Sequence, residues 1–370
     1  MFSRAPYPQL FPQERNIPML ANKTELLSML ERVRPGIREK DESNTLLDYV
    51  KFDEGVLYAN NGNILVVVLT ELDLTGAVRG KELYELVKRI KDRDIDITSD
   101  PKCFHIKTKS TKAKISVAKD FVMPIEYKAL PDNLENFKKI PPKFIECLAA
   151  CVPVCSNNAV NPALNFIKIS SSFAEAFWDS TLEYIHYDFG KKYFDKGFCI
   201  PRNGAVNLLK FPEISWYMFE KDWIYFADKG KEVFYATRII PEEKANFFPD
   251  CSNIRNSIEE TNEPIIVHDV SSAVDRLTVF SATEYLPDQL ITVTVKGDKA
   301  KMTSSNSVGS IEETVKVETK VKDTVTFCIN PISLKSCVHE GKVEFFVHNS
   351  SILVSKKENI TYMVRISNND

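Results

Sequence analysis

Apolar and polar residues follow a helical spacing in the segment 80–91. The apolar positions recur at i, i+3, i+4 and i+7, which places their side chains on one face of an α-helix. These positions are Leu83, Leu86, Val87 and Ile90. The spacing therefore predicts an amphipathic helix that buries this face. Cations gather on the opposite face and at its flanks, and they are Arg79, Lys81, Lys88, Arg89, Lys91 and Arg93.

The same plan of elements occurs three times along the chain. Each copy has a strand, a short helix opened by Pro or Gly, and three short strands separated by turns. The copies contain AVRGKELYELVKRI, FCIPRNGAVNLLKF and FCINPISLKSCVHE. Equivalent positions in successive copies are about 125 residues apart, which is the size of a small domain. A second half precedes each copy and repeats an amphipathic helix followed by strands and hairpin turns.

Each repeat is therefore predicted to be a domain of two helix-plus-sheet halves. Short strands joined by hairpins form antiparallel sheets, and both helices lie against one side of them. The sequence predicts an α+β fold of three such domains after an N-terminal tail. The predicted bounds are 1–22 for the tail and 23–130, 131–255 and 256–370 for the domains. Proline and acidic residues interrupt the periodicity near both internal boundaries.

Composition limits the classes of function. The chain has 370 residues, with 48 basic and 51 acidic side chains and a net charge of -3. This balance argues against a protein that coats nucleic acid or membrane by bulk charge, and it leaves a local basic patch possible. No segment approaches the ~18 uninterrupted apolar residues of a membrane span, and the N-terminus has no apolar run of signal-peptide length. We therefore expect no membrane association and a cytoplasmic location.

Eight cysteines without a CxxC pair argue against a disulfide framework or a zinc ribbon. Cys147, Cys151 and Cys155 follow an i, i+4, i+8 spacing, which could align three thiols along one side of a helix. Buried packing is the favoured interpretation, because their neighbours are apolar and a free cysteine behaves as a small hydrophobic residue. Pro153 should also end the helix before the third thiol aligns. We expect reduced thiols, no metal and no cofactor.

Three segments carry a resemblance to a known family. IPRNGAVNLLK at 200–210 is similar to a strand-into-helix segment of that family, and FPD at 248–250 is similar to its F-P-D-Y turn. The segment 309–334 is similar to the acidic strand and F-N-x-x-Y-L motif of the family's third domain. The family is the bacterial-type DNA sliding clamp, the beta subunit of replicative DNA polymerase III, in a divergent form like those of bacteriophages. The resemblance extends over 23–367.

The resemblance implies a head-to-tail homodimer that closes a ring of six similar domains, the DNA clamp fold. Such a ring encircles double-stranded DNA, slides on it independently of sequence, and tethers the replicative DNA polymerase as a processivity factor. No bond is made or broken, so the protein would not be an enzyme. Sliding requires contacts to phosphates, which carry no sequence information. Polymerase and clamp loader would dock through short apolar peptide motifs.

In this family the helices line the bore, so cations on the polar faces of six equivalent helices are the candidate phosphate contacts. Each of them alone also fits an ordinary solvated side chain, and it is the set that favours DNA binding. The candidates are Lys23, Arg32, Lys81, Lys88, Arg89, Lys143, Arg202, Lys210, Arg276 and Lys335. Arg202 and Lys210 also match basic positions of the family.

The same resemblance implies two protein-contact sites. A groove between the second and third domains would take partner peptides, although each of its residues also fits a core position. The groove residues are Leu164, Pro249, Ile254, Ile352, Met363 and Val364. Dimer closure would pair an edge strand of the first domain with an edge of the third domain, which brings Ile115 and Val117 against Val279 and Phe280 of a second copy.

Two other interpretations stay open. Asp94 and Asp96 could place two carboxylates on one strand face, as a metal-dependent nuclease requires. The favoured alternative is the solvated side of an edge strand, because no catalytic or phosphate-binding motif accompanies them and the five histidines lack ligand spacing. The second interpretation is a non-catalytic interaction or structural protein that keeps the clamp fold without encircling DNA.

Overall fold

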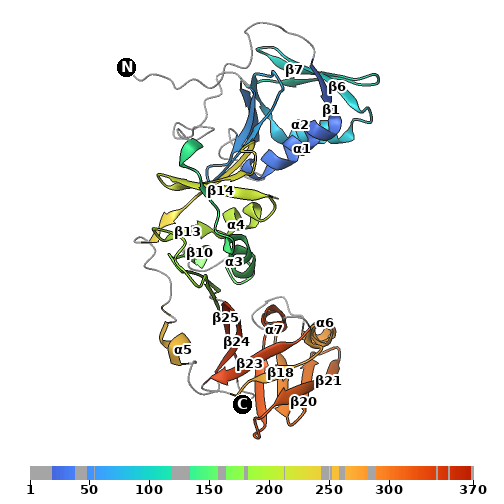
Figure 1. Cartoon of the computed structure of the whole chain (residues 1–370). Helices are drawn as coiled ribbons and strands as arrows, with labels where there is room; N and C mark the ends of the chain where they lie inside the picture. The colour runs from blue at the N-terminus through green and yellow to red at the C-terminus, as the bar shows by residue number, and fades with distance from the viewer. Residues whose placement is uncertain are drawn as a thin grey trace. The chain divides into compact units, whose positions relative to one another are not determined.

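Strands dominate the described part of the chain and pair antiparallel in sheets of four, eight and thirteen strands. The structure is a computed structural model (Figure 1). It describes residues 19–37, 48–53, 55–118, 134–156, 164–178, 182–211, 213–242, 250, 252–257, 263–281, 289–338, 341–348 and 351–367. The chain forms two compact units, and these are Met1–Lys139 with Phe211–Thr237 and Ile140–Lys210 with Arg238–Asp370.

One order of elements, a strand, a helix and three strands, occurs six times among the described residues. The first two copies are β1 (Met19–Asn22), α1 (Lys23–Val33), β2 (Tyr49–Asp53), β3 (Val56–Asn60) and β4 (Ile64–Leu69), then β5 (Gly76–Arg79), α2 (Gly80–Arg89), β6 (Asp94–Ser99), β7 (Cys103–Lys107) and β8 (Lys112–Ser116). The next two are β9 (Lys138–Lys139), α3 (Phe144–Cys151), β10 (Phe166–Ile169), β11 (Phe173–Trp178) and β12 (Glu183–Asp188), then β13 (Phe198–Pro201), α4 (Arg202–Leu208), β14 (Ile214–Glu220), β15 (Trp223–Asp228) and β16 (Val233–Arg238).

The last two copies are β18 (Ile265–Val267), α6 (Val270–Ser281), β19 (Ile291–Lys296), β20 (Lys299–Ser305) and β21 (Ser310–Thr319), then β22 (Val325–Ile329), α7 (Pro331–Ser336), β23 (Val343–His348), β24 (Ile352–Lys357) and β25 (Ile360–Arg365). Outside the repeat lie the 3-10 turns η1 (Arg34–Gly36) and η3 (Leu134–Asn136), strand β17 (Ile240–Pro241) and helix α5 (Ser252–Ser257). Six copies of one half-domain confirm the predicted α+β fold with two helices in each repeated domain.

The first unit holds the four-stranded sheet β1-β6-β7-β8 and the eight-stranded sheet β5-β2-β3-β4-β16-β15-β14-β9. Helices α1 and α2 lie side by side against its strands (Figure 1). Leu83, Val87 and Ile90 are buried, which confirms the predicted apolar face. Leu86 is half-buried, and the helix ends at Arg89, two residues before the predicted end. The polar face of α2 is therefore directed away from the sheets.

The second unit holds the thirteen-stranded sheet. Helices α6 and α7 lie side by side in it, and α6 also packs on β20 and β21. Helix α3 ends at Cys151, and Cys147, Cys151 and Cys155 are buried, as the sequence predicts. The seven cysteines in the described part of the chain are all free thiols.

Strand pairing continues across both predicted domain boundaries. Strand β4 of the predicted first domain pairs with β16 of the second, and β12 of the second pairs with β25 of the third. The two compact units therefore divide the segment 131–255 between them. The bounds 1–22, 23–130, 131–255 and 256–370 stay predictions.

One local expectation, the edge position of Asp94 and Asp96, differs from the structure. The predicted tail ends in strand β1, which pairs with β6 from Met19 to Asn22. Because β6 also pairs with β7, Asp94 and Asp96 belong to an inner strand, and the edge-strand interpretation is wrong. Strand β1 has only four residues, too few to show the period-2 pattern that would have predicted it.

Candidate nucleic-acid interface

The polar face of α2 presents the predicted cations to solvent. Lys81, Lys88 and Arg89 are exposed, and Lys88 Nζ lies 5.5 Å from the centroid of the Tyr84 ring. Arg89 Nη2 is 3.2 Å from Glu85 Oε2, and the Arg89 side chain is 80% exposed. An exposed i,i+4 pair contributes only about 0.3–0.5 kcal/mol, so a phosphate can displace Glu85. These three cations form an accessible basic face.

The two candidates on α1 have different surroundings. Lys23 Nζ donates a hydrogen bond to the Ile90 carbonyl at the C-terminal end of α2, where the helix dipole favours a cation. Lys23 therefore ties α1 to α2. Arg32 is exposed near the C-terminal end of α1 and lines a pocket with Glu213 and Asp228.

The candidates on α3 and α4 are less accessible than the sequence suggests. Lys143 is half-buried at the N-cap position of α3. Arg202 is half-buried at the start of α4, and its Nε is buried without a hydrogen-bond partner among the described residues. Lys210 is exposed just after α4 and donates to Asn207 Oδ1 over 3.3 Å. Of these three, only Lys210 has the exposure that a phosphate contact needs.

The candidates on α6 and α7 are paired with carboxylates. Arg276 donates from Nε and Nη2 to the two carboxylate oxygens of Glu313, over 2.6 and 2.9 Å. This two-pronged hydrogen bond lowers the pKa of Glu313 and raises that of Arg276. Lys335 Nζ lies 2.6 Å from Asp275 Oδ1 and so joins α7 to α6. Both cations are half-exposed and have an anionic partner in place.

The predicted peptide groove is only partly assembled. Ile352 packs with Met363 in a group that we call the Tyr184 cluster, made of Tyr184, Val354 and Met363 with Phe177, Phe346 and Ile352 packed on it. Val364 follows Met363 in β25, so its side chain lies on the opposite face of the sheet. Leu164 is buried and is not part of the cluster.

The side chains of the two remaining groove candidates, Pro249 and Ile254, are not described. Pro249 lies outside the described residues, and for Ile254 only the backbone of α5 is described. Helix α5 does contact β12, because Arg255 Nη1 lies 3.0 Å from His186 Nδ1. Burial and the nearby Arg255 cation lower the pKa of His186 to about 4, so a neutral ring accepts this hydrogen bond.

Sequence reasoning missed the polar residues around β12. Tyr184 donates to Glu175 Oε2 over 2.7 Å, and Lys168 Nζ lies 3.0 Å from Glu175 Oε1. On the other face of β12, the buried Glu183 carboxylate accepts hydrogen bonds from Ser333 and Tyr362. Strand alternation in the sequence could have separated Glu183 from Tyr184, but it could not identify the partners of Glu183 on α7 and β25 or that of Tyr184 on β11.

The predicted dimer residues lie at exposed edges. Strand β8 is an edge of the four-stranded sheet, and both Ile115 in this strand and Val117 just after it are half-buried. Strand β21 pairs with β20 from Ser310, which lies opposite Ser305, to Lys316, which lies opposite Lys299. On its other side, β21 pairs with β18 only over Val317–Thr319. The first part of β21 is therefore a second edge in the described part of the chain.

Val279 and Phe280 lie near the C-terminal end of α6 and not on a strand. Val279 is 66% exposed, and Val308 in the neighbouring β20–β21 turn is 87% exposed. A Cβ on Gly309 would lie 2.8 Å from the Phe280 ring, so glycine permits Phe280 to pack on this turn. An exposed apolar patch beside a strand edge fits a protein contact, and the pairing of Ile115 and Val117 with Val279 and Phe280 stays a prediction.

Neither a metal site nor a membrane span occurs in the part of the chain that the structure describes. No group of three or more His, Cys, Asp or Glu side chains that could hold a metal ion occurs within the described residues. None of the helices described is long and apolar enough to cross a membrane.

The six half-domains and their antiparallel sheets define the DNA clamp fold, in which helices and sheets repeat over three domains. The chain is similar to a DNA polymerase III beta sliding clamp from Bartonella birtlesii bound to griselimycin, at a TM-score of 0.78 and 17% identity over 94% of this chain and 99% of that one. It is also similar to the sliding clamp of Bacillus subtilis (TM-score 0.76, 14% identity, 95% and 99% covered) and to the Helicobacter pylori beta clamp bound to a DNA ligase peptide (TM-score 0.74, 12% identity, 95% and 100% covered). No family model and no curated protein matches the sequence.

Proposed function

We propose that the protein is a DNA sliding clamp, a processivity factor that encircles duplex DNA as a ring and tethers the replicative DNA polymerase. The observation that carries this proposal is the exposed basic face of α2, with Lys81, Lys88 and Arg89, on a chain that has the clamp fold over nearly its whole length. Contacts to phosphates alone let a ring slide, because they are equivalent at every base pair. On this proposal the protein is not an enzyme and needs no cofactor.

The ring would be a homodimer closed by the two strand edges. Antiparallel pairing of β8 with the first part of β21 from a second copy would satisfy the backbone groups at both edges. The exposed side chains are complementary in charge, with Lys112 and Lys114 on β8 and Glu312 on β21. Opposite charges across a strand pair add about 0.2–1 kcal/mol each. Ile115, Val117, Val279 and Phe280 would cover the apolar part of the contact.

Partner proteins would dock at the Tyr184 cluster. Its partly buried members, Phe177, Phe346 and Ile352, offer apolar contacts to a short peptide of polymerase or clamp loader. The Helicobacter pylori clamp is bound to a DNA ligase peptide, which supports peptide docking as the mode of recruitment. We extend the proposal to a bacteriophage clamp in the cytoplasm of a bacterial host, in line with its identity of only 12% to 17% to the bacterial clamps cited.

Two measurements test the ring. Light scattering should give twice the chain mass of 42.2 kDa. Protein loaded on nicked circular DNA should remain bound in high salt and be lost when the circle is cut, because a topological link does not depend on charge. A monomer that is released equally from circular and linear DNA would instead support the alternative, a clamp-fold interaction protein that does not encircle DNA.

A further inference from the structure

A pocket of about 220 Å³ lies in the first unit, between α1 and the strands β14 to β16. Sites for drug-sized ligands usually measure ~300–1,000 Å³, so this pocket suits a group of one or two rings. It opens on the face of the sheet that carries α1. Phe226 and Asp228 of β15 line it, and so does Ala227, whose side chain lies with that of Tyr225 in a cluster on the opposite face of the strand.

Aromatic rings form the apolar wall of the pocket. Phe226 and Tyr235 are buried, each with 1% of its surface exposed. The half-buried Phe211 ring lies 5.0 Å from the Tyr235 ring, at an interplanar angle of 50°. The accessible part of the Phe211 ring, with Tyr235 packed against it, can receive a flat apolar group by stacking or edge contacts.

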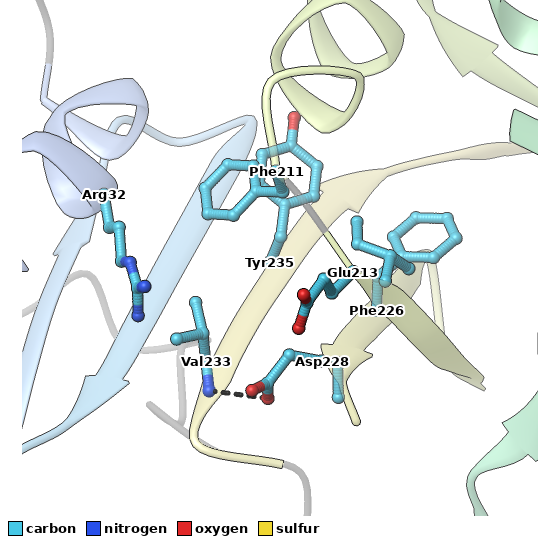
Figure 2. A pocket seen from close by; sticks show the side chains of 9 residues that line it. Arg32, Phe211, Glu213, Phe226, Asp228, Val233 and Tyr235 are labelled. Carbon is cyan, nitrogen blue, oxygen red and sulfur yellow. Dashed lines mark hydrogen bonds between the residues drawn. The ribbon is translucent and has the colours of Figure 1, made fainter. Parts of the chain in front are cut away.

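Two carboxylates and one guanidinium supply the polar groups. Figure 2 shows the Glu213 and Asp228 carboxylates next to each other, with Arg32 reaching in from α1 on the other side. Asp228 Oδ1 accepts hydrogen bonds from the backbone N–H groups of Glu232 and Val233 over 2.8 and 3.0 Å, which fixes the carboxylate. Its Oδ2 accepts none within the described residues.

Glu213 reaches the pocket from an unusual backbone conformation. Its φ of 66° is in the left-handed region, which residues other than glycine rarely adopt. Such conformations concentrate at binding sites. No ion pair joins Arg32 to either carboxylate in the part of the chain that is described, so the Arg32 guanidinium, the Glu213 carboxylate and Asp228 Oδ2 can contact a ligand.

The polar groups select the chemistry of that ligand. It must donate hydrogen bonds to two carboxylates, lay a flat ring on the aromatic wall, and offer an anion to Arg32. Two carboxylates without a third ligand do not make a metal site. A nucleotide whose base has an exocyclic amino group meets all three requirements. Carboxylates accept from cytosine N4, aromatic side chains stack on any base, and Arg binds phosphate.

We propose that this pocket binds one unpaired nucleotide with an amino-bearing base, cytosine above all. The proposal rests on the proposed function in one respect, since it takes the face with α1 as the face that meets DNA. A base that is bound in the pocket would stop the ring from sliding, because a base contact is made at one position on the strand. A ring with this pocket would pause where the duplex ends and single-stranded template begins.

The test uses the full-length protein and short fluorescent oligodeoxycytidylate and oligothymidylate of equal length, with binding followed by anisotropy. Oligodeoxycytidylate should bind at least about fivefold more tightly, because thymine has no amino group for the carboxylates. Equal affinities of the wild-type protein for the two strands would overturn the proposal.

Substitutions test whether the pocket residues cause the preference for oligodeoxycytidylate. Glu213→Gln should bring the two affinities together, since its amide offers a donor that suits thymine O4 and removes an anionic acceptor. Phe211→Ala should weaken both. Glu232→Gln is the matched control, because Glu232 is exposed in the adjacent turn and its side chain does not line the pocket. A preference that survives Glu213→Gln, or one that Glu232→Gln removes equally, overturns the assignment. Because a ring does not retain a short linear strand, whose ends are free, this result is independent of retention on circular DNA.

Discussion

Two helix pairs, α1 with α2 and α6 with α7, occupy equivalent places in the repeat, but the partners of their cations differ. The first pair is joined by Lys23 on the Ile90 carbonyl and by Tyr84, whose hydroxyl lies 3.3 Å from Glu31 Oε1. Neither link uses Lys81 or Lys88, and neither of these lysines has a carboxylate partner within the described residues. The second pair is joined by the ion pair of Lys335 with Asp275 itself.

The difference shows that a count of cations does not predict a phosphate-binding surface. Arg276 and Lys335 are cations on helices of the repeat, as Lys81 and Lys88 are. A phosphate must, however, first displace Glu313 from Arg276 or Asp275 from Lys335. The two hydrogen bonds between Arg276 and Glu313 make that exchange costly, because charge-assisted bidentate pairs are stronger than single ones. The α2 face is therefore expected to contribute most of the binding to DNA.

The largest effect should come from reversing charge on α2. Lys81→Glu with Lys88→Glu should shorten retention on circular duplex by at least about tenfold and lower the salt slope of binding by about two, since each phosphate contact contributes ~0.9. The measurement is the dissociation rate at several salt concentrations. The matched control is Arg276→Glu with Lys335→Glu, which changes the same charge. Equal losses from the two double variants would refute the contrast between the helix pairs.

The second prediction concerns the ion pair between Arg276 and Glu313. Glu313→Gln removes the anion that holds Arg276, so retention on DNA should lengthen about twofold to fivefold if the freed guanidinium gains a phosphate. The control Glu318→Gln removes a carboxylate of the same strand that pairs with Lys316 and lies outside the proposed contact between copies. Shorter retention in Glu313→Gln than in Glu318→Gln would contradict this prediction.

The same pair gives a pH-dependent prediction for stability. The pKa of Glu313 is lowered in the folded protein, so its pairing contributes fully above the unfolded pKa of about 4.3 and is lost as pH falls through the lower folded value. Arg276→Gln should therefore lower the free energy of unfolding slightly at neutral pH, because solvent screens an exposed ion pair, and the difference from wild type should disappear in acid. Denaturation at neutral and acidic pH checks this, and a difference that persists in acid would point to lost packing instead.

The sequence predicted the α2 face because both of its signals are local. The apolar spacing of Leu83 and Val87 and the cations that flank them, Lys81 and Lys88, occur within three turns of helix. Pairing of Arg276 with Glu313 could not be predicted, since it joins a helix to a strand 37 residues away. The half-burial of Arg202 depends likewise on tertiary packing. By contrast, strand alternation could have shown that Met363 and Val364 do not line one groove.

The smallest expected effect concerns the two acids beside the α2 cations. Glu85 pairs with Arg89, and Asp92 accepts a hydrogen bond from the Ser110 hydroxyl over 2.8 Å. Hydrogen bonds from Thr108 and Ser110 lower the pKa of Asp92, so it stays anionic near the basic face. Glu85→Gln with Asp92→Asn should strengthen attraction to phosphates and slow one-dimensional diffusion on DNA about twofold, because each removed anion adds one unit of positive charge near the backbone. Single-molecule tracking measures this rate. A diffusion rate equal to that of wild type would mean that these acids do not loosen the grip of α2, and the contrast between the helix pairs would then rest on the lysines alone.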